Sequence, residues 1–123
     1  MAYPEELKYT KEHVWVKKDG DTVKLGITDY AQDQLGDILF VDLPDVGAEL
    51  SSGDVFTEVE SSKTATELHV PVSGEVVAVN EDLDDSPEGI NEDAYGAWIV
   101  EIKTADSIDS LMTAGEYADM VEA

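Results

Sequence analysis

The strand-like segments of this chain are short, and a turn-forming glycine precedes three of them. Gly36-Asp37-Ile38, Gly53-Asp54-Val55 and Gly74-Glu75-Val76 each place a glycine and an acidic residue ahead of a β-branched residue. A glycine that reverses the chain before a new strand suits a sandwich or barrel of short strands. The irregular spacing argues against a solenoid. We therefore predict a mostly β fold, a flattened barrel or sandwich of short antiparallel strands with short N-terminal and C-terminal helices.

Local patterns place the first elements. The segments HVWVKK and TVKLGI alternate around a turn at residues 18–21, which predicts a hairpin with the apolar residues of its second strand on one face. Thr28 or Asp29 is expected to cap a short helix over ITDYAQDQL that ends at Gly36. The segments DILFVDL and AWIVEIK predict two further strands, and Trp15 and Trp98 are expected in the core.

The last part of the chain is expected to be helical. Thr113 and Glu116 form a T-x-x-E capping box, and Tyr117, Met120 and Val121 form a stripe that is expected to dock on the sheet. We predict one domain over residues 1–123, with a core at about 13–104 and a terminal helix at about 107–122. The polar, turn-rich segment 82–93 predicts a surface loop.

Charge and composition exclude several classes of function. The 123 residues carry 29 acidic and 7 basic side chains, a formal net charge of −22, which would repel nucleic-acid phosphates and anionic membranes. No uninterrupted apolar span of about 18 residues suggests a membrane helix, and the N-terminal residues lack a signal peptide, so we expect a cytoplasmic protein. The acidity predicts either a solvated surface or, the interpretation we favour, adaptation to a salty cytoplasm that screens self-repulsion.

One lysine stands apart from this acidic background. Lys63 is the only Lys or Arg between Leu25 and Ile102, inside VFTEVESSKTATELHVPVSGEVV. The residues on both sides are strand-like, and only Ser62 and Lys63 separate them, so the lysine is expected at an exposed hairpin tip. A lysine in such a place usually serves solubility alone. An accessible primary amine is, however, also the group that an amide-linked prosthetic arm needs.

The chain resembles the H-protein family of the glycine cleavage system from end to end. The pieces that carry the resemblance are LKYTKEHVWV, GITDYAQDQLGDILFVDLP, VESSKTATELHVPVSGEVVAVNEDL, PEGINEDAYGAWIVEIK and LMTAGEY, in this order and spacing. The resemblance implies a lipoyl/biotinyl-like barrel-sandwich hybrid and a non-catalytic carrier whose Lys63 amine is acylated by lipoate. No metal is implied.

The resemblance also implies the partners. A pyridoxal-phosphate-dependent glycine decarboxylase would transfer an aminomethyl group to the lipoyl arm, and an aminomethyltransferase would pass the one-carbon unit to tetrahydrofolate. A flavin-dependent (FAD) dihydrolipoyl dehydrogenase would reoxidise the arm, and a separate lipoate-attaching enzyme would install it. In such a scheme the cofactor carries the reactivity and the protein positions it.

The family is thought to shelter its cationic, loaded arm in a surface cleft, where carboxylates suit the ammonium end. Glu67 matches an acidic position of the family there. His13-Val14-Trp15 departs from the usual His-Glu-Trp and places valine where the family has an acid, so Glu12 is a second candidate.

Several alternatives remain open from the sequence. Biotin carriers flank their lysine with methionines, and lipoyl modules of 2-oxo acid dehydrogenases are shorter and fused to other domains. An acidic interaction protein without a prosthetic group, or a carrier that relays lipoate to other enzymes, is also compatible with the sequence. His13 and His69 are not expected to bind metal, since His69 should face solvent or a polar neighbour. Residues 82–93 match a calcium loop poorly.

Overall fold

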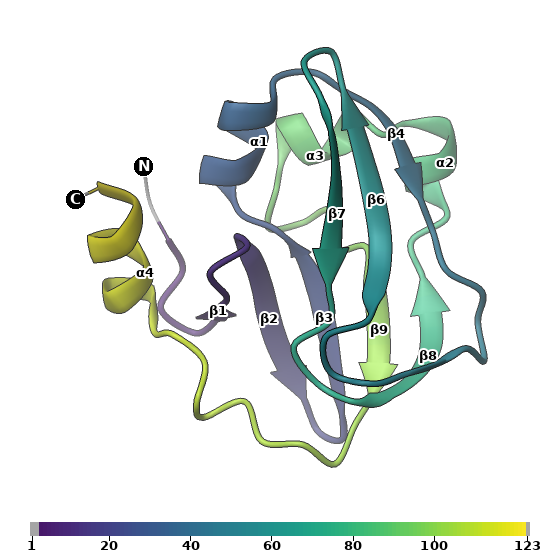
Figure 1. Cartoon of the computed structure of the whole chain (residues 1–123), viewed down its shortest axis with the longest axis vertical. Helices are drawn as coiled ribbons and strands as arrows, with labels where there is room; N and C mark the ends of the chain where they lie inside the picture. Colours follow the sequence, from purple (N-terminus) through teal and green to yellow (C-terminus); the bar gives the residue numbers. More distant parts are fainter. Residues whose placement is uncertain (1–2, 123) are drawn as a thin grey trace.

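Two antiparallel sheets form the framework of the computed structural model, which describes residues 3–122 (Figure 1). The larger sheet has the order β1-β2-β3-β9-β8-β5, with β1 Lys8–Tyr9, β2 Val14–Asp19, β3 Thr22–Ile27, β9 Val100–Lys103, β8 Gly74–Val79 and β5 Glu49–Leu50. The smaller sheet has the order β4-β6-β7, with β4 Ile38–Asp42, β6 Val55–Ser61 and β7 Ala65–His69. The sheets do not close into a complete barrel. The predicted mostly β fold is confirmed.

The core lies between the two sheets. Val23, Leu25 and Ile27 alternate along β3 and are buried, as the hairpin pattern predicts, while Val41, Val59 and Leu68 contribute one apolar side chain from each strand of the smaller sheet. Since successive side chains of a strand point to opposite faces, these residues give each sheet an apolar face toward the other sheet. The three glycine-acid triplets lie where the pattern predicts, at the starts of β4, β6 and β8.

Helix α1 (Asp29–Leu35) connects β3 to β4 and lies at one end of the sheets (Figure 1). The Thr28 side chain caps it by accepting a hydrogen bond from the Ala31 N–H at 3.2 Å, so of the two predicted caps Thr28 is the one used. Gly36 ends the helix with φ of 78°, a left-handed value that favours glycine. The predicted helix and both of its ends are confirmed.

The prediction of a surface loop over residues 82–93 is wrong. The segment forms two short helices, α2 (Asp82–Asp85) and α3 (Gly89–Glu92), because each places one apolar side chain, Leu83 or Ile90, in the core. The Asn91 side chain ties α3 to its neighbours: it accepts from the Ile38 N–H at 2.8 Å and donates to the Gly36 carbonyl at 2.9 Å.

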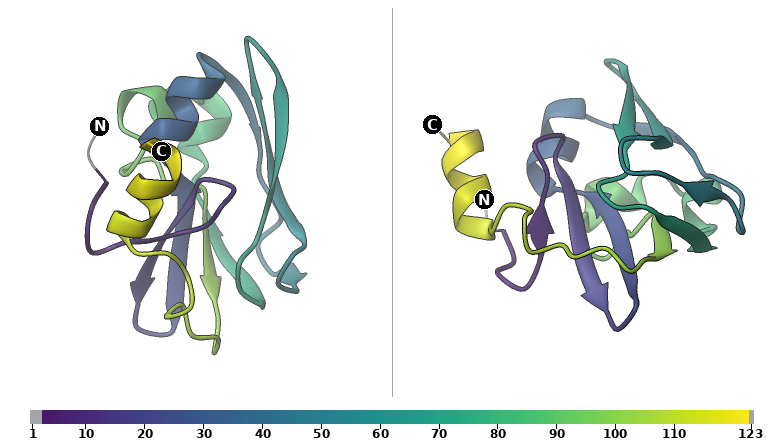
Figure 2. Two further views of the ribbon diagram at one scale, coloured as in Figure 1. Left: turned by 60° about the vertical axis from the view of Figure 1, so that its left-hand side comes forward. Right: turned by 60° about the horizontal axis from the view of Figure 1, so that its bottom comes forward.

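A second apolar cluster attaches the two ends of the chain to the outer face of the larger sheet. Tyr9, Trp15 and Tyr117 are its fully buried members, and the rings of Tyr9 and Tyr117 stack with centroids 4.9 Å apart. Trp15 is confirmed as a core residue, although in this second cluster, while Trp98 is only partly buried beside it. Figure 2 shows helix α4 packed at the side of the molecule, next to the N-terminal segment.

Helix α4 (Ala114–Glu122) has the predicted capping box. The Thr113 hydroxyl accepts from the Glu116 N–H at 3.2 Å, and the Glu116 carboxylate accepts from the Thr113 N–H at 3.0 Å. The predicted start near residue 107 is wrong, since the helix begins only after this box. The docking stripe is confirmed for Tyr117, which is buried, but Met120 is exposed. None of the described helices is long and apolar enough to cross a membrane.

Candidate functional site

Lys63 lies at the tip of the β6–β7 hairpin, which Figure 1 shows projecting beyond α1. The turn is closed by the Ser61 N–H, which donates to the Thr64 carbonyl at 2.8 Å. The Ser61 hydroxyl oxygen also accepts from the Lys63 and Thr64 N–H groups, both at 3.2 Å. The Ser62 N–H donates to the Asp37 carbonyl at 3.0 Å, which fastens the tip to the start of β4. The backbone that carries Lys63 is therefore held in place.

The Lys63 side chain itself is exposed, and no ion pair involves it among residues 3–122. Its methylene stem lies over Gly36 at the end of α1: a Cβ atom at Gly36 would be 3.3 Å from Lys63 Cε. Glycine at this position thus satisfies both the left-handed backbone and the close approach of the stem. The side chain is thus accessible from solvent, and its stem starts on the side of the hairpin that α1 occupies.

A cavity of about 220 Å³ opens on that same side of the hairpin. Helix α1 forms one wall, strands β6 and β7 form another, and the turn before β2 supplies the rim. The walls are mainly apolar, with a few polar side chains; the lining residues are Ile27, Ala31, Leu35, Val59, Leu68, Tyr30, Gln34, Thr66, Glu12 and His13. An apolar slot of this kind suits an aliphatic chain better than it suits a polar metabolite.

Among the described residues, Glu12 is the only acidic one that lines the cavity. Its carboxylate binds the end of β7 at two points: Oε1 accepts from the His69 N–H at 3.0 Å, and Oε2 lies 2.7 Å from His69 Nδ1. Glu12 reaches β7 because His13 has φ of 71°, which interrupts the strand alternation just before β2. The expectation that His69 faces a polar neighbour is confirmed. Val14, at the family's acidic position, is completely buried.

The structure does not bring Glu67 to the cavity with Glu12. Thr66 and Leu68 line the cavity, so Glu67 between them points to the opposite face of β7. There it lies directly across from Glu58, which is paired on its other side with Asp42. Partial desolvation, followed by repulsion from Glu60 and Glu67, raises the pKa of the Glu58 carboxyl.

Sequence reasoning missed the contact that holds the cavity's α1 wall. The Tyr117 hydroxyl of α4 lies 2.7 Å from His13 Nδ1 and 2.7 Å from Thr28 Oγ1, the cap of α1. Burial raises the pKa of the Tyr117 hydroxyl, which therefore stays neutral and able to donate. The apolar stripe of the last helix predicts that Tyr117 is buried, but no sequence pattern indicates hydrogen-bond partners 89 and 104 residues away.

Protonation of the His13 imidazole is expected to make the stability of the folded protein depend on pH. Burial lowers the pKa of the imidazole, against an opposing effect of the Glu12 carboxylate. The folded-state pKa thus lies below the unfolded one, so this contribution to stability is full above about pH 6.5 and is lost as the pH falls through the folded-state pKa. We expect the unfolding temperature to fall more steeply on acidification from neutral pH in the wild type than in His13→Asn, whose amide tolerates positive φ. Thermal unfolding at stepped pH measures this, and parallel curves would contradict it.

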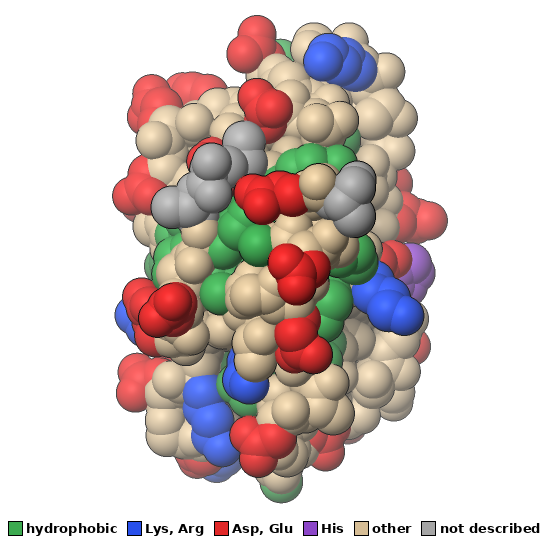
Figure 3. Space-filling model, turned by 90° about the vertical axis from the view of Figure 1, so that its left-hand side faces the viewer, with side chains coloured by type: hydrophobic (Ala, Val, Ile, Leu, Met, Phe, Trp, Pro, Cys, Tyr) green, Lys and Arg blue, Asp and Glu red, His purple; other side chains and the backbone are tan. Residues whose placement is uncertain are grey.

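Acidic side chains dominate the charged groups on one face of the molecule. Figure 3 shows acidic side chains spread over the face seen there, while basic side chains gather in its lower half except for one group at the upper end. No group of three or more metal-binding side chains occurs in the part of the chain that the structure describes.

Comparisons with known proteins agree with the geometry. A family model described as glycine cleavage H-protein matches residues 7–123. The glycine cleavage system H protein of Bacillus licheniformis is 53% identical over 99% of this chain and 98% of its own length, and that of Staphylococcus haemolyticus is 54% identical over 98% of each. The crystal structure of a glycine cleavage system H protein from Mycobacterium marinum has 38% identity and a TM-score of 0.90, covering 98% of this chain and 100% of that one. The chain therefore belongs to the glycine cleavage H-protein family, the lipoyl carriers of the glycine cleavage system, and is a carrier subunit rather than a catalyst.

Proposed function

We propose that the chain acts as a single lipoyl-carrier domain and that the Lys63 amine is the point of attachment. The observation that carries the proposal is an exposed amine that makes no ion pair with any described residue, at the tip of a hairpin whose backbone is fixed by Ser61. Acylation replaces the ammonium by a neutral amide, so the modification removes the charge of the only Lys or Arg between Leu25 and Ile102. When bound, the lipoyl group supplies a dithiolane that accepts an aminomethyl group and is reduced.

The residues around the tip fit such an arm. The Lys63 stem leans over Gly36 toward the side on which the cavity opens. The apolar walls, including Leu35 and Val59, suit the aliphatic part of a lipoyl chain, and the Glu12 carboxylate at the rim suits a cationic end. The protein's own contribution is to fix the anchor, to offer a sheltered slot and to place a counter-ion there.

We further propose that the chain works in the cytoplasm with the four proteins that the family scheme requires. These are the pyridoxal-phosphate-dependent glycine decarboxylase, the tetrahydrofolate-dependent aminomethyltransferase, the FAD-dependent dihydrolipoyl dehydrogenase and the lipoate-attaching enzyme. The decarboxylase, the aminomethyltransferase and the dehydrogenase would each act on the far end of the same arm. An anchor at an exposed tip, from which the arm can extend into solvent, supports this assignment.

The test is the intact mass of protein from a lipoate-competent host, followed by peptide mapping of the modified lysine. We expect one added lipoyl group, on Lys63. Reconstitution with the decarboxylase and measurement of glycine–bicarbonate exchange then separates the glycine cleavage role from a lipoate-relay carrier, which would be lipoylated yet inactive in exchange. Wild-type protein that stays unmodified under these conditions would instead favour an acidic interaction protein.

Glu12 and Glu67 give a matched pair for the sheltering role. We expect Glu12→Gln to release ammonia from aminomethyl-loaded protein about fivefold faster, because a charge-assisted contact to the ammonium end is weakened to a neutral one. Glu67→Gln removes the same charge from the opposite face and should change this rate much less. Colorimetric assay of ammonia over time measures both. The reverse ranking would make Glu67 the sheltering acid and Glu12 a surface residue.

A further inference from the structure

Two neighbouring apolar side chains of β4 are exposed. Leu39 and Phe40 retain 61% and 47% of their accessible surface, whereas Ile38 and Val41 on either side of them are buried. A regular strand would turn one of two successive residues inward. The pairing of β4 with β6 shifts register between Ile38 and Phe40, and this irregularity lets both side chains face outward. The fold thus displays an apolar patch, formed by Leu39 and Phe40, that a regular strand would have half hidden.

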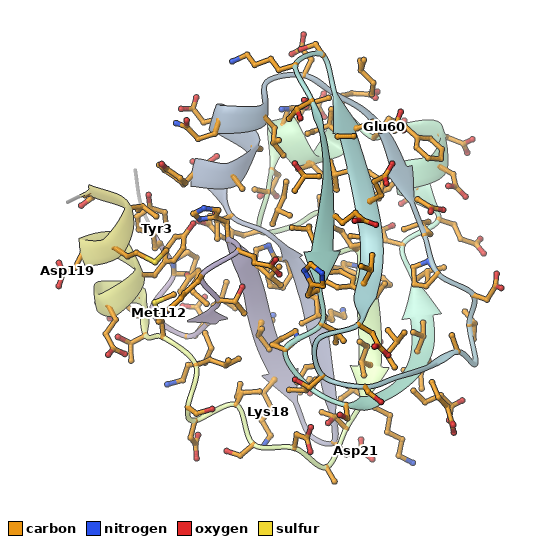
Figure 4. The ribbon with its side chains drawn as sticks, in the orientation of Figure 1. Tyr3, Lys18, Asp21, Glu60, Met112 and Asp119 are labelled. Atoms are coloured by element: carbon orange, nitrogen blue, oxygen red, sulfur yellow. The ribbon has the colours of Figure 1, made fainter. Side chains whose placement is uncertain are left out.

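The patch lies next to the hairpin tip. Phe40 is paired with Glu60 and Ile38 with Ser61, the residue whose side chain closes the Lys63 turn. Figure 4 labels Glu60, near the tip ends of β4 and β6. A protein that receives the Lys63 amine in its active site must therefore approach the patch at the same time.

The negative charge near the patch favours a partner with a positively charged surface. The exposed carboxylates on or beside β4 and β6 include Asp37, Asp42 and Glu60. A second copy of the chain would bring another formal charge of −22 to this face, which like-charge repulsion disfavours. The complementary occupant has an apolar pocket surrounded by Lys and Arg side chains.

We propose that the Leu39–Phe40 patch is the docking surface for the enzyme that acylates Lys63. The inference rests on the proposed attachment of lipoate to this lysine. In that reaction the neutral amine attacks the activated carboxyl carbon of an acyl adenylate or acyl thioester, a C–N bond forms, the adenylate or thiol leaves, and the nitrogen loses one proton. Because Nζ itself must reach the acyl carbon inside the enzyme's active site, the surface next to the hairpin tip is brought into contact with the enzyme. Enzymes that use the finished arm meet its far end instead.

The test compares two double variants of the unmodified protein. Leu39→Ser/Phe40→Ser removes the patch, and Val46→Ser/Val77→Ser removes two exposed apolar side chains that lie on other segments. Initial rates of lipoylation by a purified lipoate–protein ligase with lipoic acid and ATP are followed by intact mass. We expect the patch variant to raise KM for the protein about tenfold with kcat nearly unchanged, as the loss of an apolar anchor does at interfaces, and the control to behave like the wild type.

The outcomes separate the two proposals. Equal KM values for the patch variant and the control would overturn the docking surface while leaving Lys63 as the attachment site. No lipoylation of the wild type would overturn the proposed function itself. Size-exclusion chromatography checks the other occupant: a wild-type dimer that the patch variant converts to monomer would assign the patch to a second copy and overturn the inference. Unchanged unfolding temperatures exclude misfolding as the cause.

Discussion

Lys63→Arg will not gain the lipoyl mass and will lose glycine–bicarbonate exchange to the background level. Arginine keeps the positive charge and a stem of similar length, so the hairpin and its acidic surroundings see little change. Its guanidinium remains protonated and delocalised at every accessible pH, and it is not a nucleophile toward an activated carboxyl group. The effect is therefore all or none.

Lys103→Arg is the matched control for this experiment. Lys103 is also exposed, on β9, and its closest carboxylate, Asp21, lies 3.9 Å away. This variant should be lipoylated and active like the wild type. Both variants should unfold at the wild-type temperature, since exposed substitutions of this kind touch no packed group. A lipoyl group found on Lys63→Arg would mean that another lysine is the attachment site.

Molar KCl will raise the unfolding temperature by about 10 °C over low salt, which corresponds to roughly 2–3 kcal/mol for a domain of this size. The described residues contain one lysine–carboxylate ion pair, Lys103–Asp21, and one contact, His69–Glu12, that is an ion pair only when the imidazole is protonated. Both are exposed, against a formal net charge of −22. Repulsion is thus largely uncompensated within the chain. At 1 M salt the screening length falls to about 3 Å, which removes most repulsion between exposed carboxylates. An unfolding temperature that is the same in both conditions would refute adaptation to a salty cytoplasm.

Part of this repulsion is expected to arise in a row of carboxylates across the smaller sheet. Asp42, Glu58 and Glu67 lie opposite one another on β4, β6 and β7, and like charges in directly paired positions destabilise a sheet. We expect Asp42→Asn/Glu58→Gln/Glu67→Gln to be more stable than the wild type at low salt and to gain less from KCl. A control that neutralises three scattered acids, such as Asp33, Glu88 and Asp109, should show a smaller change.

Features fixed by neighbouring residues were predictable from the sequence. The β2–β3 hairpin, the Thr28 cap and the Thr113–Glu116 box each depend on residues a few positions apart, and the structure has all three. The segment 82–93 was predicted wrongly as a loop because its polar residues outnumber the two apolar ones. The burial of Leu83 and Ile90, which gives the segment its helical turns, is decided by the distant core.

The candidate site likewise has features that depend on neighbouring residues and features that depend on distant ones. The hairpin that exposes Lys63 follows from a local pattern, and the structure has Lys63 at the predicted position between β6 and β7. The contact of Glu12 with His69 joins residues 57 positions apart, and it depends on the left-handed backbone at His13, which no composition rule indicates. The outward direction of Glu67 follows from strand alternation, but only once the inward face of β7 is known.

The Tyr117 hydroxyl makes the cavity depend on a helix that does not line it. The anchor hairpin is formed by residues 55–69 and their β4 neighbour, whereas the cap of the α1 wall is bonded to a side chain of α4, 89 residues further along the chain. A substitution in α4 that removes this hydroxyl would therefore loosen one wall of the cavity from a distance and leave the turn that carries Lys63 untouched.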